Sequence, residues 1–300
     1  MTEETPSTVA LSRRETFGRS ALGAAAVAAA GLSLMQQAHA QAATSGKLQE
    51  VLKRGKLIVG TGTTNPPWHF EDESGKLVGM DIDMAKLFAK GLFDDPEKVE
   101  FVREAADGRI PNLITNKIDL VAQFMTITPG RARQVEFTIP YYREGVGLLV
   151  LKDSKYQNYA ELKAAGSNAT IAWLQNVGVE EYTRKVLPDI KILQVESIDA
   201  TFQSMNARRA DVTASDQSTI RWLVQKFPTR YRDLGFGWMP NSYSFAVAPG
   251  DPVWLNWLNS QIREAFLGVD FDYMKASYMK WFGIDLPIPK VGIPSEFGLG

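Results

Sequence analysis

The hydrophobic pattern from residue 47 onward alternates short apolar runs, typical of buried strands, with amphipathic helical segments. A first set of elements is predicted from this pattern. It contains strands at 56–60, 99–102 and 120–122 and helices at 81–92 and 110–114. The apolar run 147–151 leads out of this set, so a second group of elements is expected to follow it.

The second set repeats the same alternation of strands and helices. We expect helices at 159–165, 179–186, 200–207 and 216–225, and strands at 169–173, 190–194 and 211–214. A strand at 243–247 then leads back, and long helices fill 252–282. Two α/β sets joined by two extended runs predict an α/β protein with two lobes and a two-strand hinge. We place lobe 1 at 44–147 and 243–283, lobe 2 at 148–242, and an irregular tail at 284–300.

The first forty residues have the features of an export signal. The arginine pair Arg13-Arg14 precedes an apolar, alanine-rich run at 21–35, and Ala38-His39-Ala40 has the small-x-small form of a cleavage site. The run is too short to span a bilayer by itself, so a membrane anchor is the weaker alternative. We expect a twin-arginine-like signal peptide, cleavage near Ala40 and a location in the periplasm. The choice between the Tat and Sec routes stays open.

Composition narrows the chemistry. The chain has 300 residues, a formal net charge of -1, no cysteine and two histidines. These values argue against a basic nucleic-acid-binding surface, disulfides, thiolate metal sites and a histidine-based triad. The run 60–65 carries two glycines after a strand, but it lacks the third glycine and the helix start of a dinucleotide fingerprint. No metal or cofactor is expected.

The segment 119–133 has the strongest chemical signal. A short strand runs into Thr126, a helix start follows at Thr128, and Arg131 lies in the first helical turn. Free backbone N–H groups, a hydroxyl and a guanidinium in one place could hold a carboxylate. The alternative is a solvated Arg131 that pairs with Glu136.

Three further residues each allow two interpretations. Asp216 follows a strand and opens a helix, so it is either a helix N-cap or a ligand residue. Arg109, at another helix start, is either exposed or a second anion contact. Trp68 follows two prolines and is the aromatic residue best placed to line a cleft, although most of the tryptophans are expected in the core.

Several motifs in order resemble the family 3 extracellular solute-binding proteins, the periplasmic amino-acid receptors of ABC importers. The resemblance covers about residues 48–283. The motifs are P-P-W at 66–68, G-M-D-I-D at 79–83, R-I-P-N-L at 109–113, T-I-T-P-G-R at 126–131 and F-T-I-P-Y-Y at 137–142. The combination of the last two is the most specific.

The resemblance implies a clamp for a zwitterion. The arginine that matches Arg131 would hold the α-carboxylate with help from Thr126, and the acid that matches Asp216, on the other lobe, would bind the α-ammonium. Arg109 resembles the arginine that meets a side-chain carboxylate in the glutamate- and aspartate-binding branch.

The side-chain pocket departs from the family pattern. Asn65 and Ala106 stand where many members have aromatic residues, and Gly62 replaces an acid found in receptors for basic amino acids. This last change argues against lysine or arginine as ligand. In the second lobe, residues 175–178 differ from the usual anion loop. The full predicted ligand set is Arg131, Thr126, Asp216, Arg109, Asn65, Phe124, Trp68 and Gly178.

We therefore expect a monomeric, non-enzymatic periplasmic binding protein. It would capture an acidic or polar amino acid by hinge closure and deliver it to an ABC-type permease in the inner membrane. The alternative is a periplasmic enzyme on the same fold that resembles the cyclohexadienyl (arogenate/prephenate) dehydratases, because Asn65 and Ala106 leave room for a bulkier substrate. A sensor module acting through a partner is a third possibility.

Overall fold

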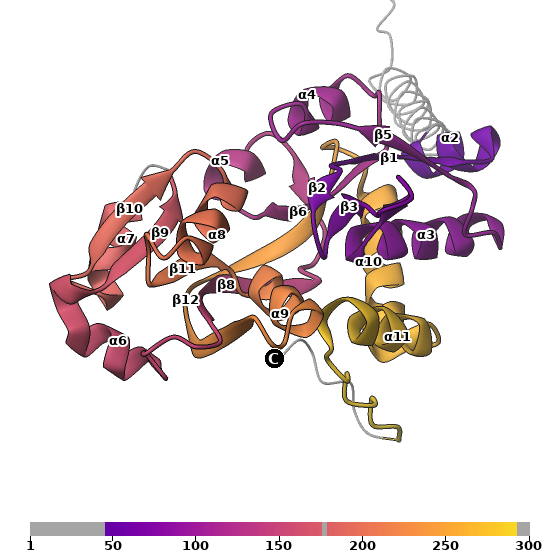
Figure 1. Cartoon of the computed structure of the whole chain (residues 1–300). Helices are drawn as coiled ribbons and strands as arrows, with labels where there is room; N and C mark the ends of the chain where they lie inside the picture. Colours follow the sequence, from indigo (N-terminus) through magenta and orange to yellow (C-terminus); the bar gives the residue numbers. More distant parts are fainter. Residues whose placement is uncertain (1–45, 176–178, 293–300) are drawn as a thin grey trace, which may run out of the picture. The chain divides into compact units, whose positions relative to one another are not determined.

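The computed structural model describes residues 46–175 and 179–292 (Figure 1). From Val51 onward these residues form one compact unit; of the preceding unit only the start of the first helix is described. The predicted export signal therefore lies outside the described residues. None of the described helices is both long enough and apolar enough to cross a membrane.

The described helices follow in chain order. They are α2 (Lys47–Arg54), α3 (Met80–Phe93), α4 (Arg109–Ile114), α5 (Pro129–Ala132), α6 (Tyr159–Ala165), the 3₁₀ turn η1 (Gly166–Asn168), α7 (Val179–Val186), α8 (Ile198–Asn206), α9 (Gln217–Lys226), α10 (Pro252–Leu267) and α11 (Phe271–Phe282). The predicted helices at 159–165 and 179–186 are confirmed at both ends. The segment 252–282 divides into α10 and α11.

The strands are equally well defined. They are β1 (Leu57–Thr61), β2 (Thr64–Asn65), β3 (His69–Glu71), β4 (Leu77–Val78), β5 (Val99–Arg103), β6 (Leu120–Thr126), β7 (Glu136–Phe137), β8 (Tyr142–Leu151), β9 (Thr170–Leu174), β10 (Lys191–Val195), β11 (Val212–Asp216) and β12 (Tyr231–Val247). The predicted strands of both sets are present.

A main sheet of nine strands organises the compact unit, in the order β10-β9-β11-β8-β12-β6-β1-β5, with β7 paired to β12. Strands β5, β1 and β6 run parallel, and so do β10, β9 and β11. The long strands β8 and β12 lie between these two parallel halves and pair antiparallel with each other (Figure 1). The predicted hinge runs at 147–151 and 243–247 are parts of these two longer strands.

The pattern missed two features. Strands β2, β3 and β4 form a separate small sheet, and β12 begins at Tyr231 rather than at 243. The small strands have two or three residues each, too few to show alternation. The early part of β12 contains Gly235, Gly237 and Pro240, which local propensity counts against a strand. Pairing with β8 overrides that preference.

Gly79 fixes how the loop at 66–68 meets α3. Its φ is 129°, and a Cβ at this position would lie 2.2 Å from the carbonyl oxygen of Trp68. With no side chain there, the first helical N–H groups reach the loop: Met80 N donates to Pro67 O (3.0 Å) and Asp81 N to Trp68 O (2.9 Å). A residue other than glycine would therefore separate the loop from the helix.

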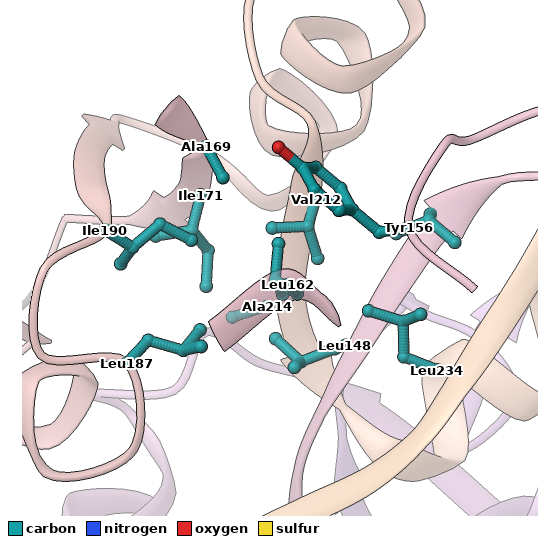
Figure 2. Packing of buried hydrophobic residues seen from close by; sticks show 11 residues of the cluster. Leu148, Tyr156, Leu162, Ala169, Ile171, Leu187, Ile190, Val212, Ala214 and Leu234 are labelled. Carbon is teal, nitrogen blue, oxygen red and sulfur yellow. The ribbon is translucent and has the colours of Figure 1, made fainter. Parts of the chain in front are cut away.

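Each half of the main sheet has its own apolar core. One cluster packs around β9, β11 and the end of β8, with Leu148, Ile171 and Val212 fully buried (Figure 2). A second cluster in the other half includes Leu113, Ile118 and Val121. Of the predicted tail, residues 284–292 are described and contain no helix or strand. The exact boundaries of the two lobes stay a prediction.

The core around β9 gives a direct test of packing. Ile171 is fully buried in this cluster, so Ile171→Ala should lower the free energy of unfolding by about 2–5 kcal/mol and Ile171→Val by about 0.5–1.5 kcal/mol. Urea denaturation followed by circular dichroism measures both values. Equal effects of the two variants would contradict tight packing at this position.

Candidate functional site

The candidate site lies at the carboxyl ends of the parallel strands β1, β5 and β6. The chain leaves these strands at Thr61, Arg103 and Thr126. Because neighbouring parallel strands end at the same edge of a sheet, the residues that follow them are brought together there. The sequence motifs at 62–68, 104–109 and 126–131 therefore meet at one edge.

Arg131 points back toward the end of β6. Thr128 is the N-cap of α5, and its hydroxyl accepts from Arg131 N at 3.3 Å. The guanidinium donates from Nη1 to the carbonyl of Thr126 at 2.9 Å. The structure thus joins Arg131 and Thr126, through the carbonyl rather than the hydroxyl. The alternative partner, Glu136, accepts instead from Gly250 N at 3.3 Å.

Arg109 is buried, with 8% of its surface exposed, so its interpretation as an exposed arginine was wrong. Its Nε donates to the carbonyl of Ala106 (2.8 Å) and its Nη1 to the carbonyl of Gln123 (3.3 Å). Burial lowers the pKa of Arg109, and the charge of Arg131 lowers it further. The two guanidinium groups are therefore close enough to repel each other. Arg109 also stabilises β6 through its hydrogen bond to the carbonyl of Gln123.

Glu104 supplies part of the counter-charge to Arg109, and no pattern in the sequence pointed to this residue. Its Oε2 accepts from Asn112 Nδ2 at 2.7 Å, and its charge raises the pKa of Arg109. Burial raises the pKa of Glu104 itself. Its Oε1 and the Oε1 of Gln123 are buried acceptors without a partner in the described structure. Both would be recognised only after the fold places them beside the site.

Asp216 is the last residue of β11 and precedes α9. Asp216 occupies the N-cap position of α9, but its side chain forms no capping hydrogen bond with the helix. The carboxylate accepts from the hydroxyl of Tyr243 at 3.0 Å instead. Burial raises the pKa of Asp216, while the hydrogen bond from Tyr243 opposes this shift. A cation at Asp216 would lower the cost of keeping this carboxylate ionised.

Strand register links Asp216 to Arg131. Tyr243 on β12 pairs with Thr126 on β6, and Thr126 carries the carbonyl to which Arg131 donates. The hydroxyl of the same tyrosine donates to Asp216. A basic group and an acidic group thus lie on either side of one paired tyrosine.

Trp68 lies at the centre of an aromatic cluster. Its ring contacts five others, with centroids 4.8–6.2 Å away: Phe124, Tyr141, Tyr142, Tyr243 and Phe282. Only 1% of Trp68 is exposed, and its Nε1 donates to Ser218 Oγ at 2.8 Å. Trp68 therefore packs edge-on against Phe124, and its direct contact with a ligand stays a prediction.

Phe124 has an unusual backbone, with a φ of 31°. A positive φ is strained for a large side chain, so the surroundings must hold it. Its N–H donates to Asp81 Oδ2 at 2.9 Å, and its ring stacks on Tyr243 with centroids 5.3 Å apart. Residues of this kind are found where a backbone must present groups to a ligand.

Asp81 is the fully buried anchor of this arrangement. Besides Phe124 N, it accepts from the hydroxyl of Tyr141 at 2.6 Å, and its Oδ2 lies 2.8 Å from His69 Nδ1. Asn65 Nδ2 lies 3.2 Å from the other ring nitrogen of His69. A neutral His69 that donates to Asp81 and accepts from Asn65 satisfies both contacts. His69 lies buried in β3.

The departure at Gly62 has a packing explanation. A Cβ at this position would lie 2.7 Å from Gln123 Nε2 and 2.8 Å from His69 Cδ2. The space of an acidic side chain is therefore already occupied. Gly178, also in the predicted set, lies outside the described residues. Within the residues that the structure describes, no group of His, Asp or Glu could hold a metal ion.

Comparison with known proteins identifies the family. The model of the family described as "Bacterial extracellular solute-binding proteins, family 3" matches residues 57–284. The glutamine-binding protein of Geobacillus stearothermophilus is 32% identical over 213 residues, covering 69% of this chain and 78% of the relative. The L-cystine-binding protein TcyJ of Escherichia coli (strain K12) is 27% identical over 272 residues, covering 90% and 97%.

Solved structures give the same result. The ancestral cationic amino acid solute binding protein AncCDT-1 is 35% identical, with a TM-score of 0.67, and covers 78% of this chain and 99% of its own. The fold is the two-lobed type II periplasmic-binding-protein fold, with β8 and β12 as the two hinge strands. The chain belongs to the bacterial extracellular solute-binding proteins of family 3. The curated relatives are named as binding proteins, which supports a binding protein over the dehydratase alternative.

Asp81 gives a test of the support behind the site. Asp81→Ala leaves His69, Tyr141 and the N–H of Phe124 without their acceptor. The free energy of unfolding should therefore fall by about 3–5 kcal/mol. Chemical denaturation measures the change. Glu73→Ala, which removes an exposed carboxylate, is the control and should stay within about 0.5 kcal/mol of the wild type. A loss for Asp81→Ala as small as that of the control would contradict the anchoring role.

Proposed function

We propose that this protein captures an amino acid by closure of its two lobes in the periplasm and delivers it to an ABC-type permease. The observation that carries the proposal is the pairing of Tyr243 with Thr126. Arg131 donates to the carbonyl of Thr126, and Asp216 accepts from the hydroxyl of Tyr243, so both charged residues are attached to one strand pair. A zwitterion has two charges of the signs that these residues complement.

Desolvation explains why both residues are needed. A buried carboxylate or ammonium costs several kcal/mol unless it is paired and hydrogen-bonded. Arg131 offers donors to a carboxylate, and Asp216 offers an acceptor to an ammonium. An open form would bind the carboxylate on lobe 1, and closure would bring Asp216 to the ammonium. Strands β8 and β12, the two connections between the lobes, would absorb the movement.

The side chain of the ligand is proposed to be acidic or polar. Arg109 and Arg131 act on one region, and the repulsion between them weakens when a carboxylate or a polar acceptor is bound there. Receptors for basic amino acids have an acid at the position of Gly62. Here Gln123 and His69 occupy the space that its side chain would need, so no carboxylate is available at this position for a cationic ligand side chain. Two of the named relatives are binding proteins for glutamine and cystine, which are polar amino acids, whereas AncCDT-1 is named for cationic amino acids.

The location and the partner follow from the family and from the N-terminal pattern. Relatives include ABC transporter amino-acid-binding proteins, which supports a permease as the partner. The arginine pair, apolar run and small-x-small site of residues 1–40 support export and cleavage near Ala40. We propose a monomer that docks on its permease in the ligand-bound form.

The two charged residues can be tested separately. Arg131→Ala or Asp216→Ala should weaken amino-acid binding about 30-fold or more, because each leaves one ligand charge buried without a partner. Isothermal titration calorimetry measures the affinities. Arg133→Ala, which removes an exposed arginine near the same helix end, should bind as the wild type does. Unchanged affinity in both alanine variants would refute the assignment.

A thermal-shift screen tests the ligand class. L-Glutamate, L-aspartate and L-glutamine should raise the melting temperature, because a ligand that binds only the folded state stabilises it. L-Arginine and L-lysine should raise it less, since Arg109 and Arg131 repel a cationic side chain. A larger shift with L-arginine than with every acidic or polar amino acid would overturn the proposed preference.

A further inference from the structure

A buried hydrogen-bond chain joins both lobes to a hinge strand. Glu144 on β8 is 2% exposed and accepts at Oε1 from Gly145 N (2.9 Å) and from Ser218 N (3.3 Å). Its Oε2 forms a short hydrogen bond with Ser218 Oγ, which also accepts from Trp68 Nε1 at 2.8 Å. Trp68 belongs to lobe 1, Ser218 to α9 of lobe 2, and Glu144 to the connecting strand. The chain therefore spans the boundary that closure would move.

Glu144 also lies close to the acid proposed to bind the ammonium. Ser218 follows Asp216 by two residues, and the negative charge of Asp216 acts on Glu144. Over residues 46–175 and 179–292, no lysine, arginine or histidine forms an ion pair with either carboxylate. Glu144 is buried and Asp216 half-buried, and two such acids without a cation repel each other, so that one of them is favoured in its protonated form.

The other groups around Glu144 do not neutralise it. Tyr142 on β8, Tyr243 on β12 and Tyr278 on α11 have pKa values raised by burial, so they are neutral phenols at physiological pH. Arg221 on α9 acts on Tyr142 and is exposed. Asn241 pairs with Glu144 across β12 and carries no charge. Burial, followed by the charge of Asp216, raises the pKa of Glu144 to about 7.

We propose that Glu144 is a positioning residue that holds a proton in the ligand-free protein and releases it when the ligand ammonium binds at Asp216. This inference rests on the proposed amino-acid binding and adds a proton exchange to it. The ammonium supplies the positive charge that the two carboxylates lack. With that charge in place, both acids can be ionised, and the proton of Glu144 passes to solvent.

The hydrogen-bond chain fits both protonation states. When Glu144 is ionised, the hydroxyl of Ser218 donates to Oε2. When Glu144 is protonated, its carboxyl group donates to Ser218 Oγ, since a hydroxyl oxygen can accept two hydrogen bonds. The bond from Trp68 to Ser218 remains in either case. In this arrangement of the lobes, the start of α9 therefore keeps its hydrogen bonds to Trp68 and Glu144 in both protonation states.

The sign of the pH dependence follows from this exchange. Ligand prefers the ionised form of Glu144, whose pKa in the free protein is about 7. Affinity should therefore rise about tenfold from pH 6 to pH 8, and binding at pH 7 should release about half a proton. A purely structural Glu144 would give neither effect.

Calorimetry in buffers of different ionisation enthalpy measures the released proton. L-Glutamine and L-glutamate serve as probes, each titrated in phosphate and in Tris at pH 7. The wild type should release about half a proton, and Glu144→Gln should release none and bind with a flat profile between pH 6 and 8. Glu180→Gln, which removes an exposed carboxylate on α7, should behave as the wild type does. Binding without proton release in the wild type overturns the inference while leaving the proposed function intact.

Nuclear magnetic resonance tests the proton site without any ligand. The indole Nε1–H of Trp68 is hydrogen-bonded to Ser218, which in turn is hydrogen-bonded to Glu144. Its signal should therefore shift with a midpoint near pH 7 in the ligand-free wild type. The shift should vanish in Glu144→Gln. If neither probe binds but the signal titrates, the proposed ligand class fails and the proton site stands. A signal that does not move between pH 6 and 8 refutes the proton site.

Discussion

Tyr243 pairs with Thr126 on one side and with Tyr142 on the other, and the two charged ends of the site depend on this register. Through Thr126 it is next to the carbonyl that binds Arg131, and through its hydroxyl it holds Asp216. A slip of one residue in β12 would turn its ring to the opposite face of the sheet. Because β12 is also a hinge strand, the strand that connects the lobes sets the spacing of the charges as well.

Charge is distributed unequally about this strand. Arg109 and Arg131 lie on the side of lobe 1, with Glu104 as a partial counter-charge, while Asp216 and Glu144 lie toward lobe 2 and the hinge. Neither side is neutral by itself, because burial raises the cost of every charge that lacks a partner. A zwitterion reduces that cost on both sides at once. The same imbalance that favours a ligand also favours a proton on Glu144 in its absence.

Packing keeps these groups in place. Asp81 holds the strained backbone of Phe124, and the aromatic rings around Trp68 fill the space behind it. Strain of this kind persists only where surrounding contacts outweigh it. These contacts hold the edge of β6 at the candidate site, and in the proposed closure the movement would fall to β8 and β12. Rigid presentation of one half of a ligand site reduces the ordering cost at the moment of binding.

The sequence by itself determined the alternation of strands and helices and hence the α/β class, because apolar periodicity reflects which face of each element is buried. The segment 126–131 also indicated a carboxylate-binding group, since residues this close in the chain share one strand–helix junction. The tertiary structure decided the rest. Gln123 and His69 fill the space at Gly62, and Ser218 meets Glu144, at a sequence separation of 74, only because α9 packs on β8. No local pattern encodes contacts between side chains so far apart, since pairing and packing of whole elements bring them together.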